Sequence, residues 1–130
     1  MVRTALAAAI LLAPVAPAFA TGEIVCASAD GSASVAIGIG RLPVLAVLRA
    51  RIEVDRTLYA TEAEGADVPI AVGQGAMTAT TITIDFTDDA ISEIVVSLRL
   101  VTVGEGDEFA TGGVLSVRGS AARVVSCELG

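Results

Sequence analysis

Four carboxylates fall within nine residues of the sequence, in the stretch DFTDDAISE. Calcium prefers oxygen ligands of this kind, so the cluster is a candidate calcium site. Its spacing matches neither an EF-hand nor a glycine-rich calcium repeat, and the paired aspartates equally suit a turn between two strands. Both interpretations stay open at this stage. The candidate ligands are Asp85, Asp88, Asp89 and Glu93.

A second acidic loop covers residues 105–108, and it could lie at the same end of the fold as the first or at the opposite end. Convergence of the two loops would favour a cation or a basic protein surface as partner. Arg49 and Arg51 lie two residues apart beside Glu53. They form either a small positive stripe or a solvated strand face whose charges pair across strands.

The chain contains no histidine, and all eight of its basic residues are arginine. These absences exclude Ser-His-Asp triads, Cys-His pairs, Ser-Lys dyads, Schiff-base chemistry and histidine metal ligands. A carboxylate pair could still hydrolyse glycosides, but Tyr59, Phe86 and Phe109 are too few aromatic residues for a sugar-stacking groove. We therefore expect no enzymatic activity and, calcium apart, no cofactor.

The chain opens as a secretory signal peptide does. Arg3 precedes an apolar run from Ala5 to Leu12, and the segment ends in the small-x-small pattern Ala18-Phe19-Ala20. We expect residues 1–20 to be the signal peptide and residues 21–130 to form one exported domain, periplasmic or secreted. A retained membrane anchor is the alternative interpretation.

Two cysteines, Cys26 and Cys127, lie 101 positions apart. In an exported chain an even number of cysteines predicts a disulfide bond. This bond would join the first strand to the last and stabilise the domain by about 4.7 kcal/mol in the chain-entropy model. The alternatives are an intermolecular disulfide and a redox-active thiol.

Acidic residues outnumber basic ones by fifteen to eight, which gives a net charge of −7. Loss of Arg3 with the signal peptide would make it −8. Nucleic acid and anionic membrane surfaces are therefore unfavourable partners. A basic envelope or extracellular protein suits this charge, and so does simple solubility.

From residue 23 onward, runs of Val, Ile, Leu and Thr alternate with polar residues and are separated by Gly and Asp turns. This pattern predicts an all-β fold of about seven to nine strands, either a small antiparallel β-sandwich or a closed β-barrel. Residues 44–54 could also form a helix after Pro43, but their alternation favours a strand. Residues 62–75 are the least regular, and we expect a long loop or an edge strand interrupted by Pro69. Strands are predicted at 23–27, 33–39, 44–54, 57–61, 68–72, 77–86, 93–103, 109–118 and 121–128.

Cysteines near both ends of a small exported β domain, with an acidic turn in CASADG after the first, make the chain similar in plan to bacterial inhibitors of C-type lysozyme. The Ser-Gly-x-x-Tyr signature of that family is absent, so the resemblance assigns no functional residue here. It implies loops that bind a basic enzyme. We therefore expect a non-catalytic protein-binding module. The alternatives are a small-ligand or calcium-binding envelope protein and a structural or stress protein without a discrete site.

Overall fold

The computed structural model describes residues 21–41, 44–120 and 122–130. The signal peptide predicted at residues 1–20 lies outside these residues. The described residues form nine strands and no helix, so none of them belongs to a helical segment that could span a membrane. The strands are β1 (Thr21–Ala27), β2 (Ala33–Arg41), β3 (Leu45–Val54), β4 (Thr57–Ala60), β5 (Val68–Met77), β6 (Thr81–Asp88), β7 (Ile94–Glu105), β8 (Glu108–Val117) and β9 (Arg123–Leu129).

The nine strands pair in sequence order, and β9 pairs with β1 to close a barrel. The fold is therefore the barrel, not the sandwich, of the two predicted architectures. Every neighbouring pair is antiparallel except β4 and β5, which run parallel. An odd number of strands requires such an exception, because strict alternation of direction can close only an even-numbered ring.

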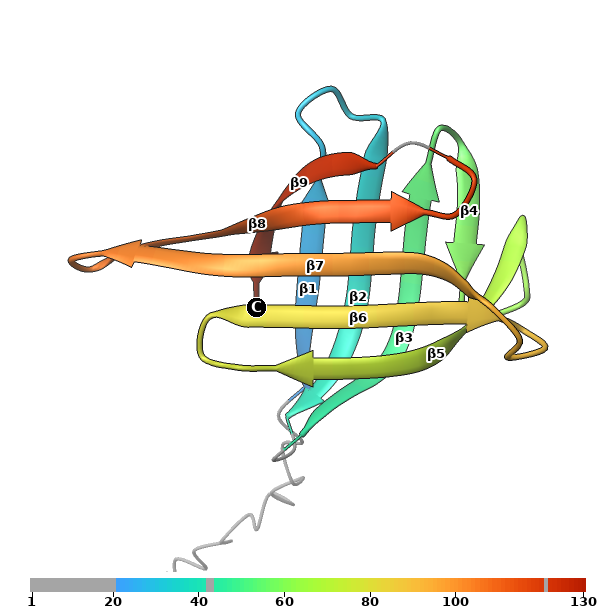
Figure 1. Ribbon diagram of the computed structural model, residues 1–130, viewed down its shortest axis with the longest axis horizontal. Helices are drawn as coiled ribbons and strands as arrows, with labels where there is room; N and C mark the ends of the chain where they lie inside the picture. The colour runs from blue at the N-terminus through green and yellow to red at the C-terminus, as the bar shows by residue number, and fades with distance from the viewer. Residues whose placement is uncertain (1–20, 42–43, 121) are drawn as a thin grey trace, which may run out of the picture.

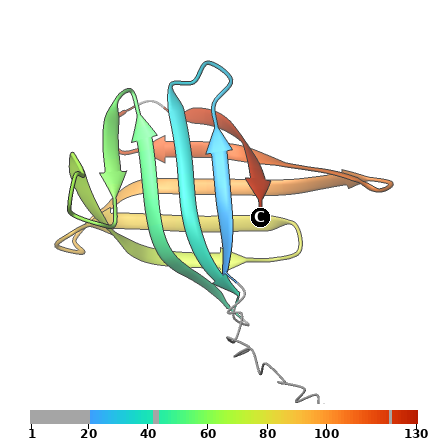
Figure 2. The same cartoon turned by 180° about the vertical axis from the view of Figure 1, so that it is seen from behind.

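The barrel is flattened into two layers whose strands cross at a steep angle. In Figures 1 and 2, β1 to β4 lie along the vertical direction of the page and β5 to β8 run across it. β9 bends between the two layers, because it pairs with β8 at one end and with β1 at the other. Crossing layers of this kind enclose the core between two inner faces.

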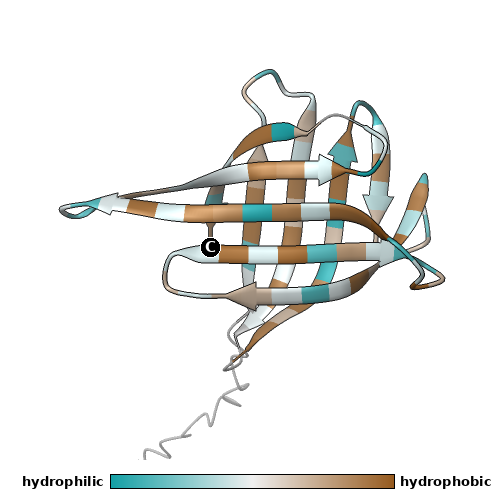
Figure 3. Cartoon of the chain, in the orientation of Figure 1, coloured by the Kyte–Doolittle hydropathy of each residue, from teal (hydrophilic) through white to brown (hydrophobic). Residues whose placement is uncertain are grey.

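Alternate residues along each strand fill this core, since successive side chains of a strand point to opposite faces. Ile84, Phe86 and Leu98 are fully buried, and Figure 3 shows apolar and polar positions alternating along β6 and β7. The alternation of residues 94–100 predicts that Ile94, Val96, Leu98 and Leu100 all point into the core, and this prediction is wrong at one residue. Ile94 is half exposed because the register with β6 shifts between Phe86 and Thr87, which moves Ile94 out of phase.

The least regular segment of the sequence contains a longer strand than predicted. β5 continues to Met77 and pairs with β6 along most of its length. Pro69 is tolerated because the parallel pairing with β4 covers only two residue pairs, and a proline removes one donor from a short ladder. The alternating segment at 44–54 forms a strand, as predicted, and not a helix.

The predicted disulfide joins Cys26 of β1 to Cys127 of β9. The two residues lie directly opposite each other in the β1–β9 ladder, with their Cα atoms 4.0 Å apart. The bond therefore fastens the first strand to the last at the point where the barrel closes.

A candidate protein-binding arm

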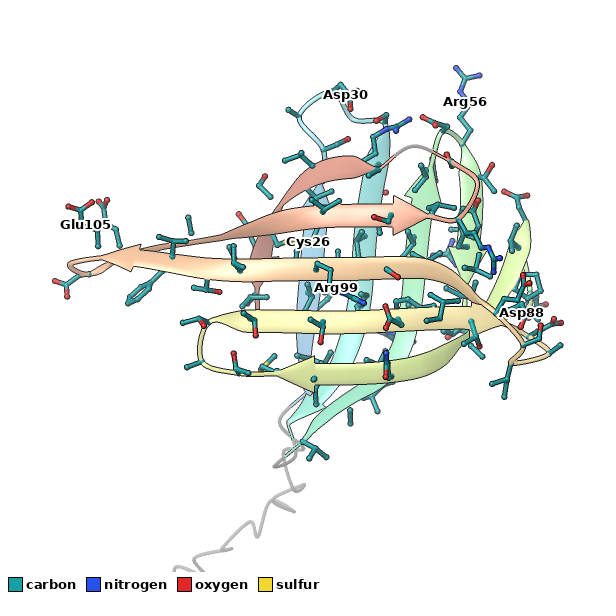
Figure 4. The ribbon with its side chains drawn as sticks, viewed as in Figure 1. Cys26, Asp30, Arg56, Asp88, Arg99 and Glu105 are labelled. Atoms are coloured by element: carbon teal, nitrogen blue, oxygen red, sulfur yellow. A yellow bond between two sulfur atoms is a disulfide. The ribbon has the colours of Figure 1, made fainter. Side chains whose placement is uncertain are left out.

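The two acidic loops lie at opposite ends of the molecule. β7 separates them: one loop precedes Ile94 and the other follows Glu105. A twelve-residue strand is roughly 40 Å long, and Figure 4 shows Asp88 and Glu105 at the two extremes of the molecule. Convergence of the two loops, which would have favoured a shared site, does not occur.

The four candidate calcium ligands do not form one cluster. Asp85 points to the outer surface of the sheet, where Nη2 of Arg99 lies 2.8 Å from its Oδ1. Asp88 accepts hydrogen bonds from the backbone and hydroxyl of Ser92, and Glu93 forms an ion pair with Arg118. Within the described chain, no three His, Cys, Asp or Glu side chains gather as a metal site. Calcium binding at these residues, Asp89 included, stays a prediction that this arrangement does not favour.

Asp85 and Arg99 form a structural pair on the outer face of β6 and β7. The Asp85 side chain is almost fully buried although it faces outward, and the amide nitrogen of Gln74 donates a hydrogen bond of 2.6 Å to Oδ2. The contact with Arg99 is the main cause that lowers the pKa of Asp85 below its usual value, while burial opposes this effect. The pair connects β5, β6 and β7 across their outer surface.

Arg49 and Arg51 are exposed on the outer face of β3, as their spacing predicts. Glu53 is exposed further along the same strand. Within the described residues, neither arginine lies in an ion pair, so the cross-paired alternative gains no support.

The end of the β7–β8 hairpin projects beyond the barrel (Figure 1). We define the arm as residues 101–111. β6 accompanies β7 only as far as Val101, and β9 accompanies β8 only as far as Thr111. Beyond these residues the two strands pair with each other up to the pair Glu105–Glu108 and the turn at Gly106, and one backbone hydrogen bond still joins Thr102 to Thr80. A two-stranded ribbon of this kind lacks a core of its own.

Apolar side chains continue into the arm although no core receives them. Val103 is 67% exposed and Phe109 is 74% exposed. On the outer face, exposed valines form a diagonal row across β7, β8 and β9. Val114 of β8 lies opposite Arg99 of β7 on one side and opposite Val124 of β9 on the other. Val101 is the next residue after Arg99 on the same face of β7. The row consists of Val103, Val101, Val114 and Val124.

Phe109 lies on the other face of the arm, the face that continues the interior of the barrel. It pairs with Gly104, and its ring covers that residue so closely that a Cβ at position 104 would lie 2.5 Å from the ring. A side chain at position 104 would displace the ring, which here covers the backbone of Gly104. The opposite side of the ring remains open to solvent.

Three carboxylates surround the turn of the arm. Glu105, Asp107 and Glu108 are all exposed, and within the described residues none of them pairs with an arginine. The tip is therefore a small, strongly acidic surface next to exposed apolar side chains.

No protein family, curated protein or solved structure was found to match the chain. By its fold and its arm, the protein is a disulfide-closed β-barrel that carries an apolar arm with an acidic tip.

Sequence reasoning identified the acidic tip but missed the apolar surface of the arm. It assigned residues 93–103 and 109–118 to barrel strands without recognising that their facing ends extend past their neighbours. The sequence carried one signal: the apolar residues of β7 change phase after Leu100, so Val101 and Val103 fall on the face opposite to the core.

Proposed function

We propose that this chain is an exported, non-catalytic protein-binding module whose arm docks on a basic protein of the cell envelope or the extracellular medium. One observation carries the proposal. Val101 and Val103 on one face of the arm and Phe109 on the other are all exposed, in a ribbon where no core exists to receive them. Exposed apolar surface of this kind is typical of protein interfaces.

Charge supports a basic partner. The arm ends in three carboxylates, and the whole chain carries a net charge of −7. Complementary charge accelerates encounter and disfavours acidic partners. The disulfide is compatible with an oxidising compartment, which supports an exported location.

The test is affinity capture from the native envelope and extracellular fraction with the purified, oxidised protein. In the first variant, Glu105→Gln, Asp107→Asn and Glu108→Gln neutralise the tip. In the matched control, Glu53→Gln, Glu62→Gln and Glu64→Gln remove the same charge from exposed residues outside the arm. We expect a basic protein that the wild type and the control capture and the tip variant loses.

A C-type lysozyme serves as a defined second probe, because it is the basic target that the resemblance in plan implies. Its binding to the three proteins is measured by calorimetry, and its cell-wall lysis is measured in their presence. Equal capture by the tip variant and the wild type, with lysozyme included, would refute the role of the arm.

A further inference from the structure

β8 and β9 separate at the base of the arm. Their last register pair is Thr111 with Cys127, and the next pair in that register would be Phe109 with Leu129. This pair does not form, because the end of β9 continues along β1, where Leu129 lies opposite Ile24. The sheet therefore forks at this point, and we call the opening between Phe109 and Leu129 the fork.

The backbone of Leu129 points into the fork. A Cα separation of 4.0 Å between Cys26 and Cys127 is typical of a pair that does not exchange hydrogen bonds, so the N–H and C=O of Cys127 point away from β1 toward β8. Because these groups alternate in direction along a strand, the N–H and C=O of Leu129 also point toward β8. Those of Gly130 point toward β1, where they exchange backbone hydrogen bonds of 2.9 and 3.0 Å with Glu23.

The backbone of Phe109 points into the fork from the other side. The N–H of Thr102 donates to the carbonyl of Thr80, which shows that Thr102 directs its backbone away from β8. Its partner Thr111 must then direct its own backbone toward β9, and Phe109, two residues along β8, does the same. Within the described chain, neither Phe109 nor Leu129 has a register partner on the side of the fork.

The fork opens onto a groove of about 810 Å³. Its walls are mostly apolar, and the only charged side chain that lines it is that of Glu128. Glu108 lies next to Phe109 in β8. Residues on both sides of the fork line the groove, among them Val25, Ala27, Thr102, Phe109, Ala110 and Leu129.

We propose that the fork receives an extended segment of the partner, which enters as an additional strand between β8 and the end of β9. The inserted strand hydrogen-bonds to the free backbone groups of Phe109 and Leu129, as in other cases of recognition by strand addition. This inference rests on the proposed function and names the part of the barrel that holds the partner.

The groove specifies the chemistry of the segment. Apolar side chains of the inserted strand contact Val25, Phe109 and Leu129, and basic side chains reach Glu128 in the groove and Glu108, the neighbour of Phe109 in β8. The occupant is therefore a partner segment that alternates apolar and basic residues. A second copy of this chain is disfavoured, because each copy brings a net charge of −7 and an acidic tip.

The first experiment uses a defined probe: a fluorescent ten-residue peptide of alternating valine and arginine with blocked ends. One matched peptide is N-methylated at alternate backbone amides, and another carries glutamate in place of arginine. By anisotropy, we expect saturable binding of the first peptide and at least about tenfold weaker binding of both others, the loss expected when backbone bonds or charge complementarity are removed. If the N-methylated peptide binds as tightly as the unmodified one, or if no peptide shows saturable binding, the inference is overturned.

The second experiment isolates one backbone donor. Phe109→Ala removes the ring but keeps the N–H, whereas Phe109→Pro removes both, and the N–H at this position faces the fork and not β7. We expect Phe109→Pro to bind the peptide about fivefold more weakly than Phe109→Ala, the order of one lost hydrogen bond. Equal affinities contradict strand addition. Unchanged thermal melting shows that both variants fold. If Phe109→Pro does not fold, the N-methylated peptide still tests whether backbone hydrogen bonds hold the inserted strand.

The two proposals fail in different ways. If the tip variant loses the captured protein but the peptide does not compete and the two Phe109 variants bind equally, the protein-binding function stands and strand insertion is wrong. If sedimentation shows a concentration-dependent dimer that the peptide dissociates, the fork belongs to a second copy and the inference is overturned.

Discussion

The two halves of β7 make the clearest comparison in this molecule. In the first half, Val96, Leu98 and Leu100 are buried between the layers of the barrel. In the second half the apolar residues change face: Val101 and Val103 lie on the outer face and are exposed, and β6 accompanies β7 only as far as Val101. One strand thus carries an apolar pattern that folds the barrel and an apolar pattern that folding does not use. We propose that this second set serves binding.

The disulfide tests the barrel half of this comparison with the largest expected effect. Replacement of Cys26 and Cys127 by alanine together should lower the free energy of unfolding by about 2–5 kcal/mol, because the bond closes a loop of nearly the whole domain. Urea unfolding measures the loss. A change below about 1 kcal/mol would mean that hydrogen bonding alone holds β1 to β9.

Leu98→Ala and Val103→Ala test the comparison within one strand. Leu98→Ala should cost about 2–5 kcal/mol in unfolding free energy, because it leaves a cavity in the core. Val103→Ala should change it by no more than about 0.5 kcal/mol, as for other surface positions. Urea unfolding of both variants gives the answer, and equal losses would show that the arm contributes to folding as the barrel does.

The Asp85–Arg99 pair lies at the border between the two halves. Asp85→Asn should lower the unfolding free energy by about 1–3 kcal/mol at neutral pH, because it removes the charge of a buried, hydrogen-bonded group. Folding lowers the pKa of Asp85, so its contribution is complete above the unfolded pKa of about 4 and is lost as the pH falls through the folded value.

Unfolding measured between about pH 5 and pH 2 should therefore show a shallower acid dependence in Asp85→Asn than in the wild type. Some dependence should remain, because hydrogen bonds from Ser32 and Ser28 lower the pKa of Asp30 to about 2. An identical slope in the two proteins would mean that Arg99 does not interact with Asp85 in solution.

Neutralisation of the tip should have the smallest effect on folding. The variant with Glu105→Gln, Asp107→Asn and Glu108→Gln should unfold within about 0.5 kcal/mol of the wild type, since these carboxylates are exposed and have no partner among the described residues. Thermal and urea unfolding measure this, and a clear stabilisation would indicate that repulsion at the turn strains the arm.

Much of the fold could be predicted because period-two alternation and turn residues mark strands directly. The strand at residues 44–54 is an example, and the cysteine count predicted the disulfide bond between Cys26 and Cys127. The barrel could not be chosen over the sandwich, because closure depends on which strands pair across the ends. The short parallel contact of β4 with β5 has no sequence pattern of its own.

The site was less predictable for the same physical reason. The sequence identified the two acidic loops. It did not place them at opposite ends of the molecule, because their separation depends on β7 forming one continuous strand between them. Phe109 looks like a core residue in the sequence, because it alternates in phase with the buried Leu115 and Val117. Only the pairing of neighbouring strands shows that it lies beyond the core. Val103 is out of phase with Leu98 and Leu100.

The central claim is that the arm binds and the barrel folds. The most direct measurement compares the double variant Val101→Thr and Val103→Thr with the control Val44→Thr, an exposed valine outside the arm. Both are assayed for urea unfolding and for capture of the basic partner. The account predicts unchanged unfolding in both and loss of capture in the double variant alone. A loss of stability comparable to that of Leu98→Ala, with capture retained, would contradict it.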